Sequence, residues 1–145
     1  MEYVEGLDLL EFFKISYMAK KQLHEKEFRF IFKKIALAIN KLHTSGIAHR
    51  DIKPENIMLT SEFEIKLIDF DFAALHAGHK GDGYLYGEYG AECYMAPEML
   101  KGLPYSGVSV DIFSYGVMLL TLRTMKEPFE KASTQDENYN ALYTD

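Results

Sequence analysis

The chain has 145 residues, of which 48% are hydrophobic and 26% are charged, and this composition excludes disordered, collagen-like and low-complexity classes. A single domain of this length buries enough apolar surface to form a substantial core. Its net charge of −6 disfavours a nucleic-acid partner held by phosphate neutralisation, and its one cysteine, Cys93, favours a reducing, intracellular compartment, in the simplest case the cytoplasm.

The first part of the chain carries two predicted helices. A short helix is expected within residues 7–15. A longer helix is predicted over 25–45, where apolar residues recur at helical spacing, namely Phe28, Ile31, Phe32, Ile35, Ala38, Ile39 and Leu42. The polar stretch 49–56 follows, and its proline excludes a continuation of the helix.

Two short strands are predicted next, at 57–60 and 64–68, because both segments are β-branched or apolar and a polar turn at 61–62 joins them. Residues 69–98 have many glycines and little periodicity. Loops of this length are usually functional or disordered, so we expect this segment to carry function.

A second helix is predicted over 109–124, with Ser109 as its cap. It is apolar on nearly all sides and is therefore expected at the centre of the fold. Its apolar stretch, 112–122, is far shorter than the ~20 residues of a membrane span, so we expect no membrane partner. The tail, 129–145, is polar, and we see no packing partner for its aromatic residues.

Three polar residues, Asp51, Asn56 and Asp69, are the candidates for chemistry. Two carboxylates and one amide oxygen form the hard oxygen environment that Mg²⁺ prefers, with phosphate oxygens and water as further ligands. Lys53 is a compact positive charge suited to holding a phosphate. Together these residues predict phosphoryl transfer, in which positioned cations and an oriented nucleophile do most of the work.

The sequence resembles the eukaryotic protein kinase family in several ordered motifs. HRDIKPEN at 49–56 resembles the catalytic loop, Asp-Phe-Asp at 69–71 stands where the family has Asp-Phe-Gly, and Ala-Pro-Glu at 96–98 matches the end of the activation segment. GAECYMAPE at 90–98 resembles the substrate-docking loop, and DIFSYG at 111–116 resembles the start of the central buried helix. Lys53, two residues after the catalytic-loop aspartate, resembles the lysine that marks serine/threonine rather than tyrosine kinases.

This resemblance implies an α+β, mainly α fold, the large C-terminal lobe of a protein kinase. It begins at residues 1–9, which resemble the hinge, and the Gly-rich phosphate loop and the Val-Ala-Ile-Lys strand are not among the 145 residues. We therefore expect an incomplete domain without the small N-terminal lobe, truncated and inactive as an isolated chain.

The resemblance also implies a role for each polar candidate. Asp51 would accept the proton of a serine or threonine hydroxyl on a protein substrate, and Lys53 would steady the γ-phosphate of ATP. Asn56 and Asp69 would hold Mg²⁺.

The nucleotide would lie against residues of the hinge and of the first strand. By the resemblance, Met58 lies under the adenine, the backbones of Glu2 and Val4 face the adenine, and Asp8 lies near the ribose. Lys53, Asn56 and Asp69 complete the expected nucleotide site on the phosphate side.

Three further residues are expected to support the site. His49 and Phe70 would stack in the apolar column that aligns the two lobes, and Asp111 would brace the backbone of the catalytic loop.

Two residues inside the motifs depart from the family. Asp71 replaces the glycine that lets this segment flip, and Ala91 replaces the threonine that bonds the catalytic aspartate and lysine. These departures support an alternative function, a pseudokinase-like binding or scaffold module.

The segment between Phe72 and Met95 contains no serine or threonine, so tyrosines are its only hydroxyl side chains for phosphorylation. We hypothesise that Glu88 or Asp82 supplies Arg50 with a fixed negative charge in place of a phosphate.

A third function class, the small-molecule phosphotransferases of the aminoglycoside and choline type, shares the catalytic-loop aspartate and the later aspartate. Those enzymes lack the Ala-Pro-Glu segment and the docking loop, both of which resemble residues 90–98 here. This difference decides against that class.

Overall fold

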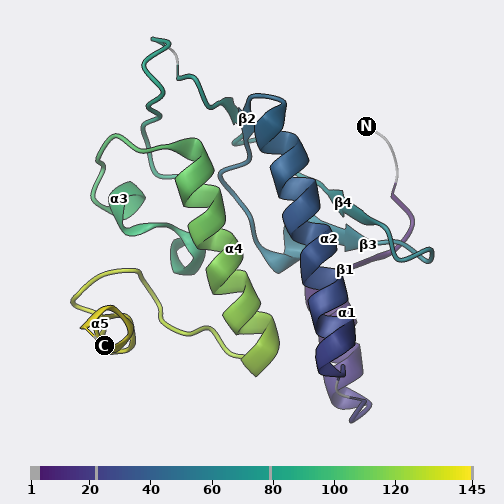
Figure 1. The fold of residues 1–145 in the computed structure, drawn as a ribbon. Coiled ribbons are helices and arrows are strands. Elements are labelled where there is room, and N and C mark those ends of the chain that lie inside the picture. Colours follow the sequence, from purple (N-terminus) through teal and green to yellow (C-terminus); the bar gives the residue numbers. More distant parts are fainter. Residues whose placement is uncertain (1–3, 22, 79, 145) are drawn as a thin grey trace.

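The structure is a computed structural model that describes residues 4–21, 23–78 and 80–144. It is mainly helical with two small antiparallel sheets (Figure 1). The elements in chain order are β1 (Leu7–Asp8), α1 (Leu9–Met18), α2 (Glu25–Thr44), β2 (Ile47–Ala48), η1 (Pro54–Asn56), β3 (Ile57–Leu59), β4 (Ile65–Leu67), β5 (Ala74–Leu75), η2 (Glu92–Tyr94), α3 (Pro97–Leu100), α4 (Gly107–Thr124) and α5 (Glu137–Thr144). No helix in the described part of the chain is long and apolar enough to span a bilayer.

The two long helices, α2 and α4, lie side by side at the centre of the molecule (Figure 1). The apolar face of α2 is buried at Ile35 and Ile39, and α4 contributes the fully buried Met118. Tyr115 of α4 donates a hydrogen bond from its hydroxyl to the carbonyl of Phe32 at 3.0 Å. The helix predicted from the apolar periodicity corresponds to α2, which ends one residue before the expected end.

The central helix α4 begins two residues earlier than predicted, at Gly107, so the assignment of Ser109 as its cap is wrong. Ser106 is the cap, and its hydroxyl oxygen accepts a hydrogen bond from the Ser109 amide at 3.4 Å. The helix needs acceptors for its first free amides, and a serine three residues before Ser109 supplies one.

A three-stranded sheet in the order β1-β3-β4 borders the helices. The two predicted strands are confirmed as β3 and β4, each slightly shorter than expected, with Ile57 paired with Leu67. Leu7 and Asp8 form β1 instead of the first turn of the predicted helix, because the Asp8 carboxylate accepts from the Glu11 amide at 2.8 Å and caps α1.

The polar tail is folded, contrary to the expectation that its aromatic residues have no packing partner. Phe129 is 5% exposed and contacts Tyr139 of α5 edge to face, with ring centroids 5.1 Å apart. Phe113 of α4 also contacts Phe129, with ring centroids 6.4 Å apart. Phe113 is 16 residues away from Phe129 in the sequence, so no local pattern in the tail predicts this contact.

The loop before α5 is organised by the carboxylate of Asp136. One of its oxygens accepts from the amides of Asn138 and Tyr139, each at 3.0 Å, and the other accepts from the amide of Glu130 at 2.8 Å. These backbone hydrogen bonds lower the pKa of Asp136 below its ordinary value of 3.8.

A carboxyl group whose pKa is lowered by folding stabilises the fold above the unfolded pKa, and this contribution is lost as the pH falls through the folded pKa. We therefore expect the amide chemical shifts of Glu130 and Tyr139 to titrate together with a midpoint below pH 3.8. NMR titration of the wild type and of Asp136→Asn measures this. A midpoint at or above 3.8, or the same titration in the Asn variant, would contradict the assignment.

Candidate active site

The loop that follows β2 is held to the central helix by one buried carboxylate, that of Asp111. Its Oδ2 accepts from the His49 amide at 2.8 Å, and its Oδ1 accepts from the Arg50 amide at 2.7 Å. Arg50 has φ +67°, in the left-handed region that a residue with a side chain occupies at a cost. Two hydrogen bonds to one fully buried carboxylate hold this conformation, which confirms the expected bracing by Asp111.

A third donor reaches the same carboxylate from the last turn of α2. His43 Nε2 lies 2.8 Å from Asp111 Oδ2, and both side chains are largely buried. His43 is not among the residues singled out from the sequence. A histidine at the end of a helix is a weak signal until the fold brings it to a buried carboxylate 68 residues away.

Asp51, at the centre of the loop, uses its two carboxylate oxygens differently. Oδ2 accepts from Lys53 Nζ at 2.7 Å and from Asn56 Nδ2 at 2.8 Å. Oδ1 is buried and has no hydrogen-bond partner among the described residues. Asp51, Lys53 and Asn56, all singled out from the sequence, are therefore brought together around one carboxylate oxygen.

The free oxygen of Asp51 lies against Gly90. A Cβ built on Gly90 would be 2.7 Å from Asp51 Oδ1 and 3.1 Å from the Arg50 carbonyl oxygen, and the first of these distances is closer than real Cβ atoms approach. Gly90 has φ +95°, so both its backbone conformation and its close approach require glycine. Ala91, the next residue, carries no hydroxyl that could donate to Asp51.

Asp69 follows β4, and the backbone ties that strand to the same loop. The Ile68 amide donates to the Asn56 carbonyl at 3.0 Å, and the Ile68 carbonyl lies 3.0 Å from His49 Nε2. Asp69 is exposed, with φ +61°. Because Asn56 Nδ2 is occupied by Asp51, its Oδ1 is the atom that faces other ligands.

The donor set fits Mg²⁺, which takes oxygen ligands and usually keeps few from the protein. Asn56 Oδ1 and the Asp69 carboxylate are the available hard oxygens. Within the described ranges no group of three or more histidine, cysteine, aspartate or glutamate side chains lies close enough to hold a metal. Phosphate oxygens and water would therefore supply the remaining ligands.

The residues after β4 include the expected ring contact. The rings of His49 and Phe70 lie 4.9 Å apart between centroids and are tilted by 46°, so the predicted pair is in contact but is not stacked face to face. Asp71 is exposed, and it is not among the described residues with positive φ. The left-handed residue of this motif is Asp69, so the replacement of glycine by Asp71 costs no strain in this arrangement.

The structure brings together part of the predicted nucleotide site. Asp8 lies opposite Met58 in the β1 to β3 pairing, and Met58 is partly buried. The Asp8 carboxylate is engaged in capping α1. Val4 is partly buried outside the regular elements, and Glu2 lies outside the described residues.

The hypothesis that Glu88 or Asp82 neutralises Arg50 is wrong, because no ion pair involves Arg50 in the part of the chain that the structure describes. The Arg50 guanidinium instead binds carbonyl oxygens and a tyrosine hydroxyl, and it lies over the ring of Tyr89 at 4.2 Å.

The docking-loop segment is fastened to α4 near this site. Ser114 donates from its hydroxyl to the Tyr94 carbonyl at 2.7 Å.

Burial, together with the nearby Glu127 carboxylate, raises the pKa of Cys93 to about 11. Cys93 is therefore a protonated thiol at neutral pH, without the thiolate character of a nucleophile.

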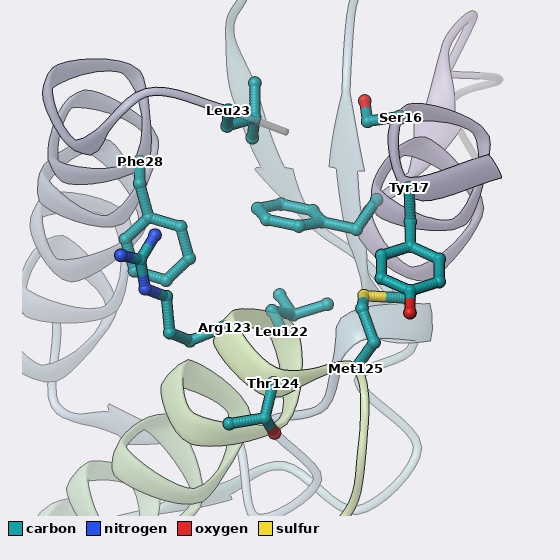
Figure 2. A pocket seen from close by; sticks show the side chains of 9 residues that line it. Ser16, Tyr17, Leu23, Phe28, Leu122, Arg123, Thr124 and Met125 are labelled. Carbon is teal, nitrogen blue, oxygen red and sulfur yellow. The ribbon is translucent and has the colours of Figure 1, made fainter. Parts of the chain in front are cut away.

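A cavity of about 420 Å³ lies elsewhere, between α1, α2 and α4 (Figure 2). Its lining residues are Phe13, Ser16, Tyr17, Leu23, Phe28, Leu122, Arg123, Thr124 and Met125. None of them belongs to the loop around Asp51, so this cavity is not part of the candidate site.

The sequence matches the protein kinase domain family over residues 1–144. It is 40% identical to a CBL-interacting serine/threonine-protein kinase 5 of Arabidopsis thaliana, 37% identical to a carbon catabolite-derepressing protein kinase of Secale cereale, and 36% identical to a maternal embryonic leucine zipper kinase of Xenopus laevis. Each match covers 99% of this chain. The chain spans 30%, 26% and 20% of those relatives, respectively.

The contact between Gly90 and Asp51 predicts a specific cost for a methyl group. We expect Gly90→Ala to lower the free energy of unfolding by about 1–3 kcal/mol more than Gly83→Ala. Gly83 is the matched control, because it has φ +80° in the same segment and a Cβ built on it would have no heavy atom within 4 Å. Denaturant unfolding of both variants measures the difference, and equal costs would show that Gly90 does not press on Asp51.

Proposed function

This chain belongs to the protein kinase family, and we propose that it forms the large-lobe catalytic machinery of a serine/threonine kinase. The donor would be ATP and the acceptor a serine or threonine hydroxyl of a protein. The observation that carries this proposal is that the two carboxylate oxygens of Asp51 differ in their hydrogen bonding. Oδ2 accepts from Lys53 and Asn56, whereas Oδ1 is buried without a partner among the described residues.

An unpaired buried carboxylate oxygen is costly, and sites that keep one usually have a catalytic reason. A substrate hydroxyl that donates to Asp51 Oδ1 would satisfy this oxygen. The same geometry lets Asp51 take the hydroxyl proton as the oxygen attacks phosphorus. Lys53 and Asn56 keep the carboxylate in one orientation, so the base is positioned before the substrate arrives.

The phosphate side of the site would be formed by Lys53, Asn56 and Asp69. Lys53 Nζ, 2.7 Å from Asp51, is within reach of a phosphoryl group that approaches the same acceptor. Asn56 Oδ1 and the Asp69 carboxylate would hold Mg²⁺. When bound, the metal neutralises the charge that develops on the phosphates.

The names of the two relatives from Arabidopsis thaliana and Secale cereale support the serine/threonine class and a protein substrate. The nucleotide-binding roles of Glu2, Val4, Asp8 and Met58 are part of the proposal. We also propose that turnover needs a Gly-rich loop and a strand lysine, which are not among these 145 residues, so the chain alone is inactive. An intracellular location stays a prediction.

A second candidate, a pseudokinase-like binding module, is favoured by Ala91. Ala91 carries no hydroxyl that could donate as the family's threonine does, and Asp51 Oδ1 has no donor among the described residues. The two candidates differ in whether Asp51 turns over a substrate.

We expect a polypeptide that joins this chain to the small lobe of a related serine/threonine kinase to transfer phosphate from ATP to a serine or threonine peptide. Asp51→Asn should lower the rate about 10²–10⁴-fold, because the amide cannot accept the hydroxyl proton. The matched control is Asp82→Asn, an exposed aspartate whose oxygen accepts from the Tyr84 amide. Radiolabel transfer with both variants measures this.

Equal rates in the wild type and Asp51→Asn would contradict a catalytic role for Asp51. Nucleotide binding without transfer in every variant would favour the pseudokinase-like module.

A further inference from the structure

The Arg50 guanidinium is engaged by neutral groups of the described residues. Its Nε donates to the Phe72 carbonyl at 2.6 Å, and its Nη1 donates to the Tyr105 hydroxyl at 3.2 Å and to the Tyr86 carbonyl at 3.5 Å. The ring centroid of Tyr89 lies 4.2 Å from Cζ. One side chain thus connects the loop beside Asp51 to both ends of the segment 72–89.

Packing against neighbouring residues holds the Tyr89 ring against the Arg50 guanidinium. The ring contacts Phe72 with centroids 5.4 Å apart. On another side it covers Gly87, where a Cβ would be 2.6 Å from Tyr89 Cε2. Tyr89 therefore places an electron-rich face against a cation, where a negative charge would otherwise be needed.

Tyr105 fastens the same segment from the connection before α4. Its hydroxyl accepts from Arg50 and donates to the Tyr86 carbonyl at 3.3 Å. Its backbone exchanges hydrogen bonds with Leu85 at 2.9 and 3.0 Å. Tyr105 is 2% exposed, and burial raises the pKa of its hydroxyl, which keeps the proton for this bond.

The segment so fastened ends against the catalytic aspartate, because Gly90 follows Tyr89 directly and lies on Asp51 Oδ1. Between Phe72 and Met95 the chain has no serine or threonine to phosphorylate. We propose that Tyr89 and Tyr105 are positioning residues that hold the segment 72–90 on the catalytic loop through Arg50, without phosphorylation. The consequence for turnover rests on the proposed function, whereas the ordering of the segment is a property of this chain alone.

Hydrogen exchange of the 145-residue chain tests the ordering directly, without nucleotide or activity. The reporters are the amides of Leu85 and Tyr105, which pair with each other, and an amide of α2 serves as the reference for global unfolding. We expect Tyr89→Leu to accelerate exchange of both reporters about fivefold, and Tyr89→Phe to stay near the wild type because it keeps the ring. Tyr84→Leu is the matched control, since Tyr84 is 52% exposed in the same segment.

Two further variants keep the test decisive if Tyr89→Leu changes the global fold. Tyr105→Phe removes only the hydroxyl that joins Arg50 to Tyr86, and it should also accelerate the Leu85 reporter. In an Arg50→Met background, Tyr89→Leu should add little, because the two side chains act as one unit.

Several results would overturn the proposal. Wild-type exchange in Tyr89→Leu, an equal effect of Tyr84→Leu, or additive effects of Arg50→Met and Tyr89→Leu would each do so. Loss of protection after phosphatase treatment of the wild type would also overturn it, because a phosphate would then hold the segment. If the exchange results hold while the fusion with a small lobe transfers no phosphate, the positioning stands and the proposed kinase activity fails.

Discussion

The arrangement of the candidate active site depends on the carboxylate of Asp111, which accepts hydrogen bonds from the His49 and Arg50 amides and lies 2.8 Å from His43 Nε2. A charge with no solvent exposure is tolerated only when its hydrogen-bonding capacity is filled. Here the partners come from α2 and from the loop after β2, while Asp111 belongs to α4. Satisfying one buried charge therefore joins the two central helices to the loop that carries Asp51.

Several residues in and beside the loop that carries Asp51 are held in locally unfavourable states. Arg50 and Asp69 both occupy the left-handed region, which costs a residue with a side chain on the order of 1–3 kcal/mol. Asp51 adds a buried oxygen without a hydrogen-bond partner among the described residues, at a further cost of about 1–3 kcal/mol. These costs gather within one loop and the strand end beside it. Such a concentration of locally unfavourable features is typical of a site maintained for function rather than for stability.

Local patterns and motifs in the sequence predicted much of this structure. The apolar periodicity indicated α2, and the motif residues Asp51, Lys53 and Asn56 do converge on one carboxylate oxygen. The errors at the tail and at Arg50 arise because the packing partner lies far away in the sequence or on an irregular segment. Phe113 packs on the tail at Phe129, which makes a polar segment fold against the core.

The contacts of Arg50 are a second case that local sequence patterns did not predict. A charged group in the segment that faces it, such as Glu88, is the natural expectation for an arginine. The structure instead presents the ring of Tyr89 and the hydroxyl of Tyr105, 55 residues away from Arg50. The path of an irregular, glycine-rich segment determines which of its side chains contacts Arg50. Hydrophobic periodicity contains no information about that path.

Hydrogen exchange at the two amides that donate to Asp111 tests this dependence most directly. In the wild type, the His49 and Arg50 amides should be strongly protected although both lie outside the helices. Asp111→Asn keeps the size of the side chain but leaves only one acceptor oxygen, so at least one of these two amides should exchange about ten times faster or more, while the α2 amides stay unchanged. Unchanged protection of both amides in this variant would contradict the claim that Asp111 positions the loop that carries Asp51.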